Sequence, residues 1–157
     1  MDTLVVYSSK YGGTEKIAEI LVEELSGDAD LINLSQKGDI YLLDYSNVLI
    51  GTPIYKGKAR KEVIDFCQKN LDILLKKNMG IFISCWFEDK FDTYIQKSFP
   101  PDLMKQAKIV HAGIEVDPSA MSLLDRFIVK TVAKMKQPVS NIKHENLQQL
   151  IESVVKS

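Results

Sequence analysis

The residues best suited to chemistry follow the first apolar run of the chain, where residues Ser8 to Glu15 read SSKYGGTE. Two hydroxyls, two glycines and a threonine at the start of a helix suit a phosphate. Glycines allow close approach of the backbone, and the first N–H groups of a helix attract an anion. The segment lacks the Gly-Lys-Ser/Thr ending of a Walker loop and the GxGxxG spacing of a dinucleotide site. The pattern indicates a phosphate site, with a plain capped turn as the alternative.

Short apolar runs predict the strands that must position this loop, and amphipathic segments predict the helices between them. Strands are expected at residues 3–7, 29–34, 47–51, 79–84 and 108–116. Helices are expected at 14–25, 58–75, 121–136 and 144–155. Apolar strands that alternate with helices form a parallel sheet covered on both faces, joined by right-handed crossovers. The expected fold class is α/β: a three-layer sandwich around a five-stranded parallel sheet of order 2-1-3-4-5, with an extra helix before the last helix.

Composition and charge describe a single globular domain over residues 1–157. Apolar residues make up 45% of the chain and the net charge is −1, so the basic excess of a nucleic-acid-binding protein is missing. No run of apolar residues is long enough to span a membrane, and the N-terminus does not resemble a signal peptide. Two separated cysteines, Cys67 and Cys85, and two histidines do not predict a metal site. These features predict a cytoplasmic protein with free thiols.

The phosphate-type loop resembles the FMN phosphate loop of flavodoxins. Ser9, Gly12 and Thr14 fall on the pattern Ser/Thr-x-x-Gly-x-Thr, whereas Lys10 replaces a small residue. The resemblance implies a flavodoxin-like fold and FMN as the cofactor. In such a sheet the ligand lies at the carboxyl ends of the strands, where the strand order reverses. The residues implied for the phosphate are Ser9, Lys10, Tyr11, Gly12, Gly13 and Thr14.

The same resemblance implies two loops that contact the flavin ring. After the third strand the residues implied are Thr52, Pro53, Ile54, Tyr55 and Gly57. After the fourth strand they are Ser84, Cys85, Trp86 and Phe87. The alternatives are that Tyr55 is an ordinary exposed aromatic beside a turn, and that Trp86, the single tryptophan, packs in the core.

A narrower resemblance is to the menaquinone-dependent protoporphyrinogen oxidases. Residues 124–130 read LDRFIVK, and a similar Asp-Arg-Phe helix lies between the last strand and last helix of that family. Ile50, Gly51, Ile54 and Gly57 also match the form of its second loop. The resemblance implies an FMN oxidoreductase that passes electrons to a quinone. The stretch 88–104, however, is shorter and less basic than in those oxidases, which favours a flavodoxin-type carrier between protein partners.

Both functions leave the redox chemistry to the flavin, so we nominate no catalytic residue. For the oxidoreductase, Tyr55 and Trp86 are candidates to line the substrate side. Lys58 and Arg60 are candidates to meet substrate carboxylates. A carrier would instead need a redox protein partner. A third alternative, a fold that acts only through contacts without flavin, is disfavoured by the intact first loop.

The predicted helix from Met121 to Lys136 is basic as well as amphipathic. Its charged residues are Asp125, Arg126, Lys130, Lys134 and Lys136, a local charge of +3. Such a helix can lie on an anionic membrane, which would make the protein peripheral to the inner face of the membrane. The alternative is that its apolar stripe packs on the sheet and its lysines are merely solvated.

Overall fold

The parallel core of the sheet has the predicted order, and two antiparallel strands are added to it. The computed structural model describes residues 2–36 and 38–155. The strands are β1 (Thr3–Tyr7), β2 (Asp30–Asn33), β3 (Asn47–Tyr55), β4 (Lys58–Ala59), β5 (Asn78–Ser84), β6 (Lys108–Val116) and β7 (Val139–Ile142). They form one sheet of order β2-β1-β3-β5-β6-β7, with β4 paired to β3. The strands β2, β1, β3, β5 and β6 run parallel, which confirms the order 2-1-3-4-5. The expected number of five strands is wrong, because β4 pairs antiparallel with the end of β3 and β7 pairs antiparallel with β6 at the edge of the sheet.

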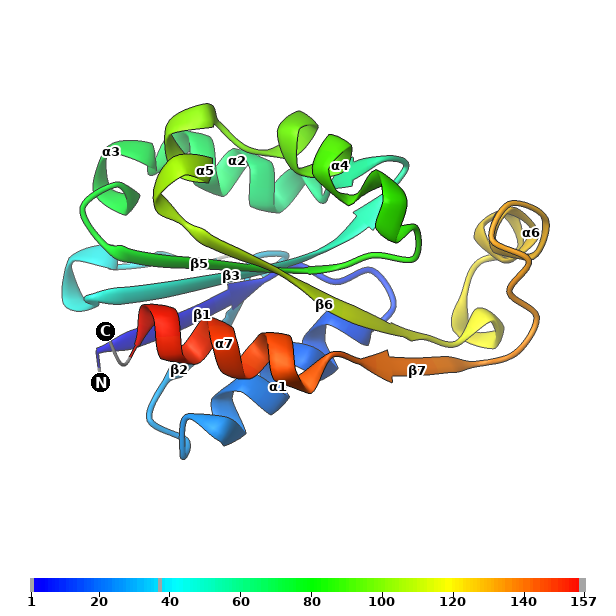
Figure 1. The fold of residues 1–157 in the computed structure, drawn as a ribbon, viewed down its shortest axis with the longest axis horizontal. Coiled ribbons are helices and arrows are strands. Elements are labelled where there is room, and N and C mark those ends of the chain that lie inside the picture. Colours follow the sequence, from blue (N-terminus) through cyan, green and yellow to red (C-terminus); the bar gives the residue numbers. More distant parts are fainter. Residues whose placement is uncertain (1, 37, 156–157) are drawn as a thin grey trace.

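Helices cover both faces of the sheet (Figure 1). The helices α1 (Gly13–Glu24) and α7 (His144–Val154) lie on one face. The other face carries α2 (Lys61–Lys69), α3 (Leu71–Leu74), α4 (Phe91–Ser98) and α5 (Pro101–Gln106). Successive side chains of a strand point to opposite faces, so Leu4 packs in one core and Val5 in the other. In the described part of the chain, no helix combines the length and apolar composition that a bilayer crossing requires.

The single helix expected at 58–75 is wrong. The chain first forms a hairpin, in which Tyr55 pairs with Lys58 across a two-residue turn. The turn residues Lys56 and Gly57 have φ of 54° and 84°, as such hairpin turns require. The helical part is then divided at Asn70, whose side-chain amide donates to the carbonyl of Phe66 at 2.9 Å and competes with helix continuation.

The region between β6 and α7 forms a long excursion at one end of the molecule. β6 and β7 make an antiparallel ribbon in which Val116 pairs with Val139. Residues 117–138, which connect the two strands, are called the excursion below. Within this connection α6 spans Leu123–Thr131, shorter than the helix expected at 121–136. The side chain of Ser122 caps its start by accepting from the N–H of Asp125. After α6, Lys134 adopts a φ of 55° and the chain turns back, so that Met135 is buried. In Figure 1, α6 stands beyond the end of the β6–β7 ribbon, away from the other helices.

Candidate functional site

A cavity of about 380 Å³ opens at the carboxyl ends of β1, β3 and β5. Every residue of the predicted site lines it except Gly12 and Thr52. One further wall comes from the excursion, with Met121, Asp125, Ile128, Val129, Val132, Ala133 and Met135. Other parts of the chain add Lys56, Lys90, Tyr94, Ile114, Glu115 and Val116 to the lining. The structure therefore brings the three predicted loops together at the point where the strand order reverses. It also adds a fourth wall that sequence reasoning did not assign to the site.

The loop between β1 and α1 is shaped by its glycines. Gly12 precedes the helix with a φ of 88°, a left-handed conformation that favours glycine. A Cβ on Gly13 would lie 2.0 Å from the carbonyl oxygen of Glu115, so only glycine fits between the loop and β6. Ser9 folds back on the loop, where its Oγ accepts from the N–H of Gly12 at 2.9 Å. The first N–H groups of α1, which have no partner inside a helix, are left for an anion.

Thr14 provides the observation that tests whether a phosphate fits this loop. Its side chain is buried, and among the described residues its Oγ1 has no hydrogen-bond partner. A buried hydroxyl without a partner is rare and costs about 1–3 kcal/mol. Because Thr14 stands in the first turn of α1, an anion bound at the helix start would supply the missing acceptor. The donors of this loop therefore fit a phosphate group.

The other two loops place aromatic side chains at the cavity. Trp86 lines it and is 39% exposed, so the alternative that this tryptophan packs in the core is wrong. Cys85 is buried beside it, donates to the carbonyl of Phe87, and has its pKa raised by burial. Such a thiol is a packing residue rather than a reactive one. Thr52 is also buried, and its Oγ1 accepts from the N–H of Arg60 at 3.0 Å, which closes the β3–β4 hairpin.

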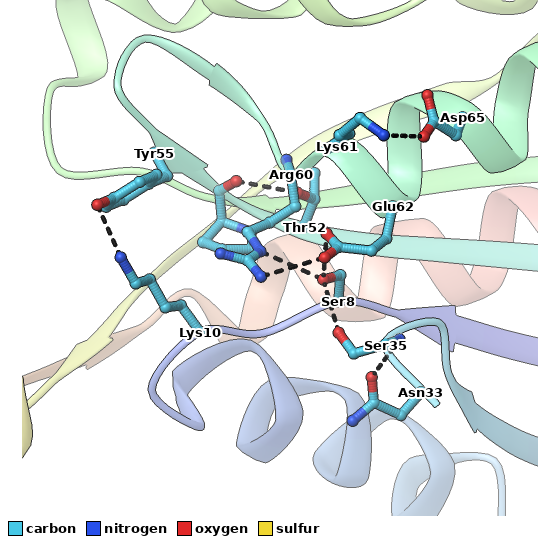
Figure 2. Close-up of polar contacts among 11 residues, drawn as sticks. Ser8, Lys10, Asn33, Ser35, Thr52, Tyr55, Arg60, Lys61, Glu62 and Asp65 are labelled. Carbon is cyan, nitrogen blue, oxygen red and sulfur yellow. Dashed lines mark hydrogen bonds and ion pairs between the residues drawn. The ribbon is translucent and has the colours of Figure 1, made fainter. Parts of the chain in front are cut away.

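Asp125 of α6 ties the excursion to two of the cavity loops, a contact that sequence reasoning missed. Its carboxylate accepts from the Tyr55 hydroxyl at 2.8 Å and forms an ion pair with Lys10 Nζ at 2.6 Å. The hydroxyl of Tyr11 donates to the same carboxylate. Lys10 in turn donates to the Tyr55 hydroxyl at 2.7 Å and lies over the Tyr55 ring (Figure 2). These four residues form the Asp125 latch, which closes the excursion over the cavity.

The ionisation of Asp125 follows from these contacts. Burial alone would raise its pKa, but the hydrogen bonds from Lys10, Tyr11 and Tyr55 together outweigh burial and hold the pKa at about 2. The pKa of Lys10 is raised by its hydrogen bond to Asp125 and then by that to Tyr55. Asp125 is therefore a carboxylate and Lys10 a cation throughout the physiological range, and the latch stays charged.

Arg60 does not take the place expected for it. Its Nε donates to Ser8 Oγ at 3.3 Å, and its Nη2 pairs with Glu62 at 3.4 Å (Figure 2). Ser8 also donates to Glu62 at 3.2 Å, so Ser8, Arg60 and Glu62 contact one another. Neither Lys58 nor Arg60, the candidates for meeting substrate carboxylates, lines the cavity. The cations that line the cavity are instead Lys10, Lys56 and Lys90.

His111, a second residue without an expected role, holds β6 to the loop after β5. Its Nδ1 accepts from the N–H of Gly113 at 3.1 Å, so its Nε2 carries the proton and donates to the carbonyl of Cys85 at 2.9 Å. Burial lowers the pKa of His111. The ring is thus neutral and structural. Across residues 2–36 and 38–155, no group of three or more His, Cys, Asp or Glu is arranged to hold a metal.

This neutral histidine predicts a pH dependence of stability. Because the folded pKa of His111 lies below its ordinary value of 6.5, the folded state binds fewer protons than the unfolded state. The contribution of the neutral His111 ring to the free energy of unfolding is complete above about pH 6.5 and is lost as the pH falls through the folded pKa. We expect the free energy of unfolding in urea to decrease between about pH 7 and pH 5. The variant His111→Gln should show a smaller decrease over this range, and an equal slope in both proteins would contradict this role.

The sheet order, the loops at its carboxyl edge and the phosphate-type loop define an α/β protein of the class that binds a phosphorylated ligand at a topological switch point. A family model for the flavodoxin domain matches residues 4–142, and the chain belongs to this family. An uncharacterized protein of Methanocaldococcus jannaschii is 29% identical over 117 residues, which cover 74% of this chain and 71% of the relative.

Solved structures of flavodoxins and flavoproteins share the fold. A short-chain flavodoxin associated with a PDU bacterial microcompartment superposes with a TM-score of 0.60 at 20% identity, over 99% of this chain and 98% of that one. A flavodoxin of Streptococcus pneumoniae TIGR4 gives 0.55 at 18% identity, over 98% and 97% of the two chains. A flavoprotein of Lactobacillus acidophilus in complex with FMN gives 0.54 at 14% identity, over 71% and 91%. At these identities the likeness concerns the fold.

Proposed function

We propose that the protein binds FMN and acts as an oxidoreductase that passes electrons to an apolar acceptor of the quinone class. FMN is supported by the family, by the FMN complex of the Lactobacillus acidophilus flavoprotein, and by the unpartnered Thr14 hydroxyl in the phosphate-type loop. When bound, the flavin supplies the redox chemistry by taking up a hydride from a donor and delivering its electrons to an acceptor.

The residues of this chain would hold and orient the cofactor. The hydroxyl of Thr14 and the first N–H groups of α1 would bind its phosphate, where the helix dipole also favours the anion. Tyr55 and Trp86 would contact the ring, because both line the cavity next to this loop. The Asp125 latch would restrict water at the site by holding the excursion across the cavity.

The observation that carries the choice of acceptor is the apolar wall built by the excursion. Ile128, Val129, Val132, Ala133 and Met135 line the cavity on this side. Apolar side chains with few polar groups are the usual lining of a small-molecule site. A ring system without charge, such as a quinone, would lose little hydration on entering it. The resemblance of residues 124–130 to the quinone-dependent oxidases is consistent with this acceptor.

An anionic donor is compatible with two exposed cations of the rim, Lys56 over the Tyr55 ring and Lys90 over the Phe87 ring. Lys56 and Lys90 line the cavity and are exposed, whereas Lys10 is held by Asp125. Ammonium groups in these positions could attract carboxylates of a substrate such as a porphyrinogen. They take the place that the sequence had suggested for Lys58 and Arg60.

The second candidate is a carrier of electrons between proteins. It is favoured by the flavodoxins that match nearly the whole chain and by the exposure of Trp86 at the rim, which leaves the cavity within reach of a protein partner. A carrier should transfer electrons to a protein acceptor, and changes in the apolar wall should then have little influence.

The two candidates are separated by reoxidation of the reduced flavoprotein. We expect menadione to reoxidise the dithionite-reduced protein faster than ferricytochrome c does. Val132→Asp, which places a charge in the wall at a side chain that is already exposed, should slow the menadione reaction about tenfold and spare the cytochrome reaction. The control is Leu43→Asp, because Leu43 is exposed and does not line the cavity. Preference for cytochrome c, with menadione rates equal in all variants, would support the carrier instead.

A further inference from the structure

The outer side of α6 exposes apolar side chains that nothing in the described chain covers. Leu123 is 81% exposed, Leu124 66% and Phe127 65%. Of the nine large apolar side chains exposed in the described residues, five belong to residues 123–132, so they are concentrated rather than scattered. A monomeric protein seldom leaves such a concentration open to water unless it contacts a partner or a membrane.

These side chains share one side of the helix. Leu123 and Phe127 are four residues apart, so they lie one above the other on successive turns, with Leu124 beside them. Ile128 and Val132 belong to the other side of the segment, because both line the cavity. Asp125, on the side turned to the body, is buried in its latch with Lys10, Tyr11 and Tyr55. The latch therefore fixes which side of α6 faces outward. One alternative from the sequence was that the apolar stripe packs on the sheet. Leu123, Leu124 and Phe127 do not, because they are exposed.

The charge around this face has a single sign. Lys130, Lys134 and Lys136 are exposed. Arg126 is partly used inside the excursion, since its guanidinium donates to the carbonyls of Pro118, Ser119 and Met121. Between residues 118 and 138, all of which the structure describes, the one carboxylate is Asp125, which is buried and paired. Asp117, the first residue of the excursion, is exposed and accepts from the N–H and the hydroxyl of Ser119. From residue 118 on, the exposed part of the excursion is apolar and cationic, within a chain of net charge −1.

We propose that the outer face of α6, defined by Leu123, Leu124 and Phe127 with Lys130 and Lys134 beside them, binds an anionic lipid surface. Apolar side chains on a short helix can enter the boundary between headgroups and acyl chains, while neighbouring lysines meet the anionic headgroups. Binding does not require bound flavin. It extends the proposed function, because the inner side of the same segment lines the cavity where an apolar acceptor would arrive.

A second copy of the chain fits this face less well. A two-fold contact would place the face against itself, so the lysines of the two copies would oppose each other. The one exposed carboxylate of the excursion, Asp117, already accepts two hydrogen bonds from Ser119. An anionic bilayer supplies both an apolar interior and negative charge. With only a few cations and one short helix, its attachment should be reversible and sensitive to salt.

The test is cosedimentation of the full chain with vesicles. We expect binding to vesicles that contain phosphatidylglycerol at low salt, and little binding to pure phosphatidylcholine or at high salt. Lys130→Glu with Lys134→Glu should reduce the partition coefficient by at least about 25-fold, since each lysine near such a surface contributes about fivefold. Leu123→Ser with Phe127→Ser should reduce it by about tenfold or more.

Matched controls separate the face from general surface effects. Lys97→Glu with Lys105→Glu changes the net charge equally on α4 and α5, and should have a much smaller effect. Leu43→Ser alters a leucine that is 82% exposed elsewhere and should leave binding unchanged. Circular dichroism of each variant confirms that it is folded before its partition is compared.

Three results would overturn the proposal. The first is no binding of the wild type to anionic vesicles. The second is equal loss in the α6 variants and their controls. The third is concentration-dependent dimerisation without lipid that Leu123→Ser abolishes, which would assign the face to a second copy. A protein that binds vesicles but shows no quinone turnover would leave this proposal standing and overturn the proposed acceptor.

Discussion

Replacing Thr14 by valine will weaken FMN binding by about 10- to 100-fold. The hydroxyl is buried and has no partner among the described residues, so it is free to donate to a phosphate oxygen. A hydrogen bond to a charged group contributes about 1.5–3 kcal/mol, and valine has the same shape without the hydroxyl. The dissociation constant is measured by titrating the flavin-free protein with FMN and following flavin fluorescence.

The same substitution should not destabilise the flavin-free protein. Valine removes a buried polar group that has no partner, which is neutral or favourable for folding. The control is Thr93→Val on α4, where the hydroxyl that is lost is exposed and does not line the cavity, so FMN affinity should not change. If Thr14→Val bound FMN as tightly as the wild type, the assignment of this loop to the phosphate would be wrong.

Replacing Asp125 by alanine will release α6 from the cavity. Lys10, Tyr11 and Tyr55 all direct hydrogen bonds to this one carboxylate. Because the excursion is held at the end of a two-stranded ribbon, we expect local opening rather than global unfolding. Hydrogen–deuterium exchange of the amides in residues 118–136 should accelerate about 10- to 100-fold, with smaller changes in β1, β3 and β5.

The comparison for this prediction is Asp65→Ala. Asp65 pairs with Lys61 at 3.1 Å on the exposed side of α2, where such a pair contributes about 0.3–0.5 kcal/mol. Its loss should leave exchange in the excursion unchanged. Unchanged protection of α6 in Asp125→Ala would show that packing of Val129 and Met135, and not the latch, keeps the excursion closed.

The centre of the parallel sheet could be predicted from the sequence because β1, β3 and β5 are buried over most of their length. β1 has the predicted bounds because an apolar run of this kind indicates a buried strand. β6 also has the predicted bounds, although only part of it is buried. β7 could not be predicted because residues 139–142 read VSNI, a short run with polar residues that is typical of an edge strand. The Lys56-Gly57 pair is a turn signal that favours the β3–β4 hairpin. The amphipathic pattern after it predicts a helix from residue 58, whereas the helix begins at Lys61, after β4.

The three cavity loops could likewise be predicted, because parallel strands bring their carboxyl ends to one edge. The Asp125 latch could not. Asp125 and Lys10 are 115 residues apart in sequence, and an acidic residue on a basic amphipathic helix reads as an ordinary solvated charge. Only the path of the β6–β7 ribbon turns that side of α6 inward. The exposure of Leu123 and Phe127 results from the same orientation of α6, so it could not be predicted from the sequence either.

This flavodoxin-family chain is proposed to bind FMN through the loop after β1. The most direct measurement is to saturate the purified protein with a mixture of FMN and FAD, remove unbound flavin, denature the protein and identify the released flavin by chromatography. We expect the released flavin to be FMN alone, in an equimolar amount with the chain, and much less of it from Thr14→Val. Release of FAD alone, or of no flavin after saturation, would contradict it.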